Sequence, residues 1–294
     1  MPRSRKKTAQ VSPQIIPGMG TLYVVATPIG NLEDITLRAL RVLKEVDLIA
    51  AEDTRHTRKL LTHFGISTPT LSYYKEKEQL RSAVIINKLH EGLNIALVSD
   101  AGTPGISDPG SILVHKATAE NIKIEPIPGP SSLTAALSVA GIPDGSFVFL
   151  GFAPPRKKQR QDLLFSLRQE KRQLVFFEAP HRLLSFLQDC FDILGDRSVF
   201  WCRELTKMHE ELTRDSLSII LTHCQGKKIK GESVFIISGA AAGPEISNAE
   251  LEEIFRAYKK SGEKSLKDTV REVAAEHKLS RTAVYNKALK IWKE

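Results

Sequence analysis

The chain has 294 residues, enough for about two globular domains, and its charged (26%) and hydrophobic (41%) fractions are those of an ordinary folded protein. No apolar run approaches the roughly 18 residues that a membrane helix needs, and no apolar segment follows the basic start, so neither a membrane protein nor a secreted one is expected. The net charge of +8 favours an anionic partner.

Residues 1–19 are expected to form a disordered basic tail, either a solvated terminus or an arm that touches RNA. From residue 20 onward, short apolar segments alternate with helical patterns, which predicts an α/β domain over 20–143 with a mostly parallel, covered sheet. Strands are expected at 22–26, 48–51, 70–74, 95–98 and 122–127. Helices are expected at 34–46, 79–91, 111–120 and 133–140, and another is expected to end at Phe64.

The stretch 94–110, NIALVSDAGTPGISDPG, is the first candidate ligand site. Its apolar start predicts a buried strand, and the glycines that follow allow the backbone to bend tightly and approach a ligand. In open α/β sheets ligands bind at the carboxyl ends of strands. The polar side chains expected there are Asp100, Thr103, Ser107 and Asp108.

A second candidate lies at 128–132, PGPSS, just before a predicted helix. Free N–H groups at a helix start suit a carboxylate or phosphate, whereas Ser131 and Ser132 equally fit an ordinary helix cap. Both interpretations stay open at the level of the sequence.

The alternation of strands and helices starts again after 143, which predicts a second α/β domain over 144–241. Strands are expected at 147–151, 174–177, 198–202 and 233–238. Helices are expected at 159–169, 183–194 and around 216–221.

The remaining 245–294 is predicted to be a small helical domain, with helices at 251–258, 266–277 and 281–292. The last two helices and the brief turn between them resemble a helix-turn-helix. This domain therefore serves either to contact DNA or RNA, or for dimerisation or substrate docking. Basic residues cluster at 156–160, at 227–230 and at 278–293, which favours a nucleic-acid partner.

Several chemistries lack their sequence motifs. There is no P-loop, no dinucleotide fingerprint after a strand and no HExxH, so nucleoside triphosphates, dinucleotides and metal hydrolysis are not expected. Cys190, Cys202 and Cys224 form no chelating pair, which argues against a metal site and a disulfide framework and favours a reducing cytosol. Loops at 52–57, 177–182 and 203–207 place carboxylates beside arginines, a combination suited to proton transfer and an anionic polymer.

Taken together, the motifs resemble the ribosomal RNA small subunit methyltransferase I family, a branch of the tetrapyrrole methylase superfamily. The resemblance extends from about residue 20 to residue 294. It rests on YVVATPIGNLEDIT at 23–36, AEDTR at 51–55, VSDAGTPGISDPG at 98–110, PGPSS at 128–132 and FEAPHR at 177–182. The first turn, TPIGN, has fewer glycines than in superfamily members that act on tetrapyrroles, which speaks against such a substrate here.

The resemblance implies two α/β domains of tetrapyrrole-methylase type with a cofactor cleft between them, followed by the helical domain. It implies a cytoplasmic homodimer that uses S-adenosylmethionine to methylate the ribose 2′-oxygen of a cytidine in small-subunit (16S) ribosomal RNA, either free or in the assembling 30S subunit. The cofactor-binding residues carried over from the family are Pro28, Asp100, Ala101, Gly102, Thr103, Ser107, Asp108, Ser131, Ser132, Phe177 and Ala240.

A ribose hydroxyl is a weak nucleophile, so a nearby base is expected to remove its proton. The candidates are Glu178, Asp53 and His181, and Arg55 is expected to hold phosphate together with Arg182 and Arg203. Two alternatives remain: a methyltransferase of the same superfamily that acts on a small molecule, and a non-catalytic protein that binds nucleic acid through its tail.

Overall fold

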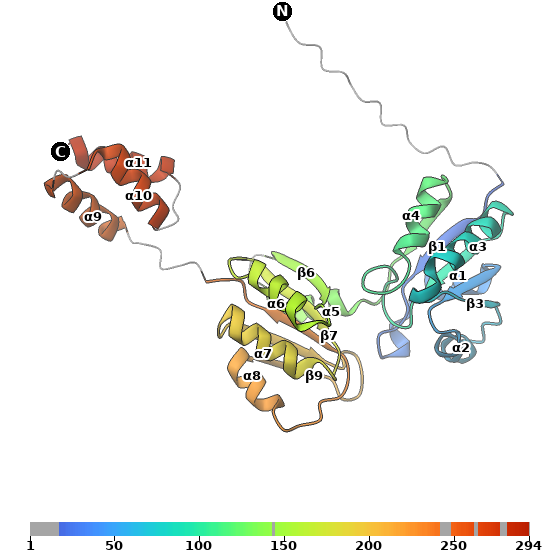
Figure 1. The fold of residues 1–294 in the computed structure, drawn as a ribbon. Coiled ribbons are helices and arrows are strands. Elements are labelled where there is room, and N and C mark those ends of the chain that lie inside the picture. The colour runs from blue at the N-terminus through green and yellow to red at the C-terminus, as the bar shows by residue number, and fades with distance from the viewer. Residues whose placement is uncertain (1–17, 143–144, 242–247, 262–263, 277–280, 294) are drawn as a thin grey trace, which may run out of the picture. The chain divides into compact units, whose positions relative to one another are not determined.

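A computed structural model of the chain describes residues 18–142, 145–241, 248–261, 264–276 and 281–293 (Figure 1). The chain divides into two compact units, Met1–Gly239 and Ala240–Glu294. The predicted basic tail at 1–19 lies almost wholly outside the described residues, and so do the predicted boundary positions 143 and 144. The divisions predicted at 143/144 and at 241–245 therefore stay predictions.

The first sheet is parallel throughout, with the strand order β3-β2-β4-β1-β5. Its central strand β4 is buried along its whole length, so it shows the continuous apolar run typical of a sheet covered on both faces. This confirms the parallel, covered sheet predicted from the sequence. The strands are β1 (Thr21–Val25), β2 (Leu48–Ala51), β3 (Thr70–Ser72), β4 (Ile95–Val98) and β5 (Lys123–Ile127).

Helices cover both faces of this sheet, with one hydrophobic cluster on each. Neighbouring residues of β2 point to opposite faces, so that Ile49 belongs to one cluster and Ala50 to the other. The first α-helix begins at Leu37, later than predicted, because Thr36 caps it by accepting a hydrogen bond from Ala39 N–H at 3.1 Å. The helices are η1 (Leu32–Asp34), α1 (Leu37–Glu45), α2 (Thr54–His63), η2 (Lys75–Lys77), α3 (Glu78–His90), α4 (Ser111–Ala119) and α5 (Ser132–Ala140).

The second sheet is mixed, with the strand order β6-β7-β10-β8-β9. Only β6 and β7 run parallel, and β10 is antiparallel to both of its neighbours. The strands are β6 (Phe147–Phe152), β7 (Gln173–Glu178), β8 (Ser198–Arg203), β9 (Glu211–Ser216) and β10 (Ser233–Ile237). The sequence did not predict β9, because this edge strand, ELTRDS, is mostly exposed and lacks an apolar signal.

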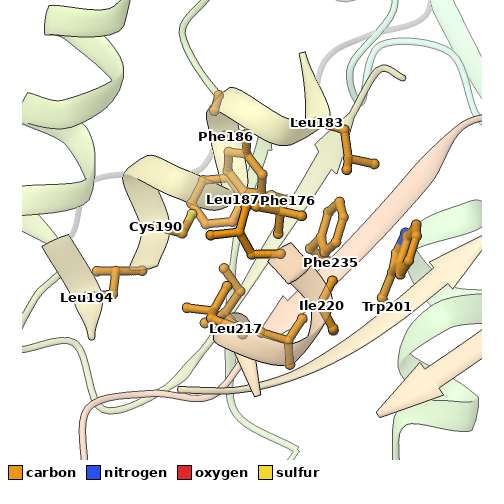
Figure 2. Packing of buried hydrophobic residues seen from close by; sticks show 14 of the residues in the cluster. Phe176, Leu183, Phe186, Leu187, Cys190, Leu194, Trp201, Leu217, Ile220 and Phe235 are labelled. Atoms are coloured by element: carbon orange, nitrogen blue, oxygen red, sulfur yellow. The ribbon is translucent and has the colours of Figure 1, made fainter. Parts of the chain in front are cut away.

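Three helices cover one face of the second sheet: α6 (Lys157–Ser166), α7 (Leu183–Leu194) and α8 (Leu217–Cys224). The core beneath them is aromatic (Figure 2), with Trp201 stacked on Phe235 at a centroid distance of 5.7 Å. The opposite face packs against α5 through Ala136 and Ala140. Thus α5 joins the two halves of the first unit, although the sequence analysis grouped it with the first sheet.

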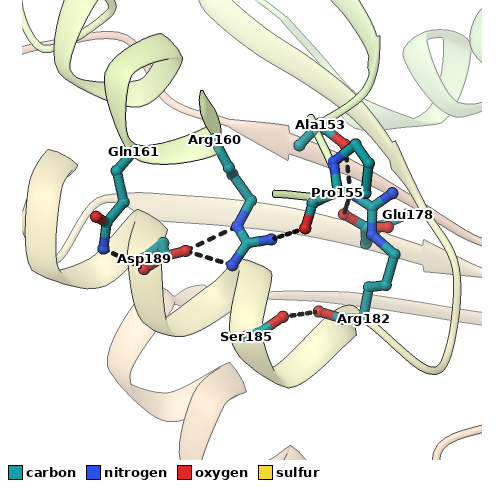
Figure 3. A network of polar contacts seen from close by, with 8 residues as sticks. All are labelled: Ala153, Pro155, Arg160, Gln161, Glu178, Arg182, Ser185 and Asp189. Atoms are coloured by element: carbon teal, nitrogen blue, oxygen red, sulfur yellow. Dashed lines mark hydrogen bonds and ion pairs between the residues drawn. The ribbon is translucent and has the colours of Figure 1, made fainter. Parts of the chain in front are cut away.

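A buried ion pair links α6 to α7 (Figure 3). Arg160 Nε lies 2.7 Å from Asp189 Oδ2, and Gln161 donates to the other carboxylate oxygen at 2.9 Å. The side chain of Arg160 is only 5% exposed. Arg160 therefore belongs to the interior of the protein and not to the basic surface that the run 156–160 suggested.

The second unit is helical and has a hydrophobic core of its own, which includes Phe255, Val273 and Ala288. Its helices are α9 (Asn248–Ser261), α10 (Leu266–Glu276) and α11 (Arg281–Lys293). The turn predicted between the last two helices lies outside the described residues. None of the helices in the described ranges combines the length and the apolar character needed to span a bilayer.

Candidate functional site

A cavity of about 250 Å³, called here the larger cavity, is lined by residues from both sheets. Its walls are the loop after β4, the start of α5, the ends of β6, β7 and β8, and the start of β10. Ten of the residues predicted from the sequence line it: Asp100, Ala101, Gly102, Thr103, Ser107, Asp108, Ser131, Ser132, Phe177 and Glu178.

The loop after β4 is fixed to its neighbours by backbone hydrogen bonds. Gly102 and Thr27 exchange both N–H···O bonds, at 2.9 and 3.0 Å, and Gly102 has a φ of +78° that favours glycine. Thr103 Oγ1 donates to the carbonyl of Pro130 at 3.3 Å. The two motifs singled out in the sequence, 98–110 and 128–132, therefore lie against each other in one wall.

A buried carboxylate holds the far end of the same loop. Glu78 Oε1 accepts hydrogen bonds from Gly110 N–H at 2.9 Å and from Tyr73 Oη at 3.0 Å. Gly110 has a φ of +144°, and a Cβ there would lie 3.2 Å from Gly105 N. A side chain at this position would displace the loop, so its course depends on glycine.

The start of α5 leaves backbone donors available. Ser131 is the N-cap residue, but its side chain makes no capping hydrogen bond. Ser131 and Ser132 both line the larger cavity, so the helix start faces a space in which a ligand can lie. Between the two interpretations left open by the sequence, this geometry favours an anion-binding helix start.

The larger cavity is strongly acidic. Its one basic lining residue, Lys207, lies 2.8 Å from Glu204 Oε1 and is thereby paired. Away from the start of α5, a space of this kind favours cationic groups over anionic ones. The carboxylates that line it are Glu52, Asp100, Asp108, Glu178, Glu204 and Glu232.

Glu52 and Asp108 are two of the carboxyls in this cavity whose pKa is raised. Burial, followed by the charge of Asp108, raises the pKa of Glu52 to about 7. Burial likewise raises the pKa of Asp108. A cation that enters the cavity would favour the ionised form of both groups.

Glu178 ends β7 with a side chain that is inaccessible to solvent. Its Oε1 accepts from Ala179 N–H at 2.9 Å, and its Oε2 lies 3.2 Å from Arg182 Nη2 (Figure 3). Burial raises the pKa of Glu178, although these hydrogen bonds and the nearby positive charges oppose the shift. Glu178 is therefore held rigidly at the wall of the larger cavity.

Five of the predicted site residues do not line the larger cavity: Pro28, Asp53, Arg55, His181 and Ala240. Asp53 caps α2 by accepting from Arg55 N–H at 2.8 Å, and hydrogen bonds from the Arg55 side chain lower its pKa. The backbone N–H of Asp53 donates to Asp100 Oδ1 at 3.0 Å, so Asp53 contacts a lining residue of the larger cavity without lining the cavity itself. Pro28 lines a smaller cavity, His181 is exposed, and Ala240 begins the second unit.

Glu52, Glu204 and Glu232 also line the larger cavity, although the sequence motifs did not predict them as site residues. The first two lie in loops noted in the sequence for their charge, and position at a strand end could have identified them. Glu232 directly precedes a strand, so a search for polar residues that follow strands does not identify it. Among the described residues no group of three or more His, Cys, Asp or Glu side chains is arranged to hold a metal ion.

Comparison with known proteins gives consistent matches. A family described as Tetrapyrrole (Corrin/Porphyrin) Methylases matches residues 21–220. A relative from Synechocystis sp., named Ribosomal RNA small subunit methyltransferase I, is 46% identical over 276 residues, which cover 93% of this chain and 99% of the relative. A relative of the same name from Thermotoga maritima is 51% identical over 221 residues, covering 75% of this chain and 99% of the relative.

Among solved structures, the fold is similar to that of the methyltransferase CobJ, with a TM-score of 0.57 and 18% identity. The match covers 76% of this chain and 95% of that one. At this identity the likeness extends to the fold alone.

Proposed function

The chain belongs to the ribosomal RNA small subunit methyltransferase I family of the tetrapyrrole methylases, and we propose that it methylates the ribose 2′-oxygen of a cytidine in small-subunit ribosomal RNA. It is a methyltransferase, and S-adenosylmethionine is its methyl donor. The observation that carries the proposal is the acidic larger cavity, built from the loop after β4 and the start of α5.

The residues of the larger cavity fit S-adenosylmethionine by their chemistry. The carboxylates suit its sulfonium and ammonium charges, and the free helix start at Ser131 suits its carboxylate. Ile106, Phe152 and Phe177 offer apolar surface for an adenine ring. We therefore propose the ten predicted residues that line this cavity as its donor-binding residues, with Glu52 added.

The bound donor supplies an electrophilic methyl group. The chain must align the ribose hydroxyl, keep water out and accept a proton. We propose two carboxylates for the proton: Glu178, whose position is fixed by Arg182, and Glu52, whose pKa of about 7 suits a base at neutral pH. Asp53 and His181 are weaker candidates, because the pKa of Asp53 is lowered and His181 does not line the cavity.

Ribosomal RNA as substrate is supported by the names of the relatives and by exposed positive charge at Lys227, Lys228 and Lys230. We further propose that the protein acts in the cytoplasm as a homodimer on free RNA or on the assembling small subunit. Light scattering of the purified chain tests the dimer.

The decisive experiment incubates the full chain with S-adenosylmethionine labelled in its methyl group and with purified small ribosomal subunits or their free RNA. The label should appear in the RNA, and nuclease digestion should return it in a 2′-O-methylated cytidine. Label that appears in a small molecule, or in no product, would contradict the proposal.

Two variants distinguish the candidate bases. The two variants are Glu178→Gln and Glu52→Gln. The variant that removes the true base should lower turnover by about 10² to 10⁴-fold. The other variant should lose less. Both should still bind S-adenosylmethionine in a titration, with a reduced affinity for Glu52→Gln above pH 7. Full turnover in both variants would remove both carboxylates from the role.

A further inference from the structure

A smaller cavity of about 160 Å³ lies beside α2 and shares Asp100 with the larger cavity. The two cavities also lie on either side of the same turn, because Pro28 lines the smaller cavity and Ile29 lines the larger. Methyl transfer requires the reacting atoms to approach within about 3 to 3.5 Å, so an acceptor must bind in a space that adjoins the donor. Among the described residues, the smaller cavity meets that condition.

Most of the exposed surface inside the smaller cavity is apolar, with Pro28, Leu32 and Leu60 in its walls. A flat ring can pack between such side chains, as bases do when enzymes turn them out of a nucleic-acid strand. A pyrimidine, the smaller kind of base, suits a space of this size.

One hydroxyl in the wall is unsatisfied. Thr57 is 3% exposed, and its Oγ1 makes no hydrogen bond to any group in the described part of the chain. A threonine in a helix has two accessible χ1 rotamers, and a rotation here would break no hydrogen bond. Its hydroxyl can both donate and accept, so it can pair with the amino group or the ring nitrogen of a cytosine.

A lysine and a histidine lie at the rim of the same cavity. Lys59 and His56 both line it from α2, on either side of Thr57 in the sequence, and both side chains are exposed. Lys59 makes no ion pair within the described ranges. Both side chains are thus available to bind phosphate groups. The larger cavity is acidic and would repel phosphate groups.

Building on the proposed function, we infer that the smaller cavity receives the base of the target cytidine, turned out of the RNA strand, while Lys59 and His56 contact the flanking phosphates. The ribose would then lie over Asp100, at the wall common to both cavities.

The test uses the full chain with substitutions in α2. Thr57→Val keeps the shape and removes the hydroxyl, and Thr57→Ser restores it. Lys59→Gln removes a rim charge, and Arg58→Gln is its matched control, because Arg58 is equally exposed on α2 but does not line the cavity. The readouts are kcat/KM for label transfer to small subunits, affinity for S-adenosylmethionine, and the melting temperature.

Thr57→Val and Lys59→Gln should each lower kcat/KM for the RNA about tenfold, while donor affinity stays unchanged. Thr57→Ser should recover most of the loss, and Arg58→Gln should change nothing. Thr57→Val should not lower the melting temperature, because it removes a buried hydroxyl that has no partner. A purely structural role of Thr57 would lower stability and activity together.

Equal activity of Thr57→Val and the wild type, or of Lys59→Gln and Arg58→Gln, would overturn the inference. Should the wild type label no RNA, the proposed function fails, and cytidine 3′,5′-bisphosphate then tests the cavity by itself. The wild type saturated with S-adenosylhomocysteine should bind this nucleotide, and Thr57→Val should bind it more weakly. Absence of binding, or equal binding by both proteins, would again overturn the inference.

Discussion

Glu52 lies just after β2 among the carboxylates of the larger cavity, and burial together with the charge of Asp108 raises its pKa to about 7. Its carboxyl is thus mostly protonated below pH 7 and mostly ionised above it. A sulfonium favours the ionised form, so affinity for S-adenosylmethionine should rise between pH 6 and 8, and binding near neutral pH should release a proton.

Titrations with S-adenosylmethionine across this pH range test the expectation, and Glu52→Gln should flatten the profile. S-adenosylhomocysteine, which lacks the sulfonium charge but keeps the ammonium group, serves as the control ligand and should show a weaker dependence. The raised pKa of Glu52 affects the folding stability of the free protein in the opposite direction to donor affinity. Between pH 4.5 and about 7 the folded state holds a proton that the unfolded state has lost, so stability should fall as the pH rises. A profile that Glu52→Gln leaves unchanged would assign the titration to another group.

The buried pair of Arg160 and Asp189 carries a second prediction at this scale. Asp189→Ala would leave a guanidinium uncompensated in the interior, which should cost about 3 to 5 kcal/mol of unfolding free energy. Lys158 and Asp162, on the same helix α6, form an exposed pair at 3.0 Å, so Asp162→Ala should cost about 0.5 kcal/mol or less. Urea unfolding of both variants makes the comparison, and similar losses in the two would contradict it.

At the scale of the element, the loop between β4 and α4 depends on one glycine. A Cβ at Gly110 would approach Leu97 Cδ2 to 3.0 Å and Gly105 N to 3.2 Å, at a φ of +144°. Gly110→Ala should therefore destabilise the fold by about 1 to 3 kcal/mol and weaken donor binding, because the loop must shift.

Gly141 offers the matched control. It also has a positive φ, +59°, but a Cβ there meets no atom within 4 Å. Gly141→Ala should cost about 1 kcal/mol and leave donor affinity unchanged. Calorimetric titration with S-adenosylmethionine distinguishes the two variants, and equal affinity in both would show that the loop tolerates a side chain at Gly110.

Elements with strong apolar patterns could be predicted from the sequence, and β4 and α7 have the bounds expected of them. The edge strand β9 could not, because all of its side chains except Leu212 are polar. The same limit applies to the site. β10 runs antiparallel to β7 and β8, so Ser233 at its start pairs with Glu178 and Arg203 at their ends. Glu232 therefore lies at the ligand-binding edge although it precedes its strand, and a search of strand ends passes over it.

At the scale of the whole molecule, the chain consists of two units with separate hydrophobic cores. The clusters of the first unit involve residues up to Ile237, and the cluster of the second lies within 251–292. The relative from Thermotoga maritima is matched over 99% of its length by 75% of this chain, so a protein of the same name is shorter. From these two facts we expect that the chemistry does not require every part of the chain.

A variant that ends at residue 241 should therefore fold, bind S-adenosylmethionine as the full chain does, and methylate small subunits with a KM raised about tenfold, because it lacks the basic residues of 278–293 that we expect to contact RNA. Rates measured at several salt concentrations, together with a donor titration, test this. In the full chain, Lys290→Gln removes one exposed charge from α11 and should lower the salt dependence of binding by about one ion. An unchanged KM in the shortened chain would assign the helical unit to dimerisation, which light scattering would then detect as a loss of the dimer. A loss of donor binding would instead make the helical unit part of the catalytic body.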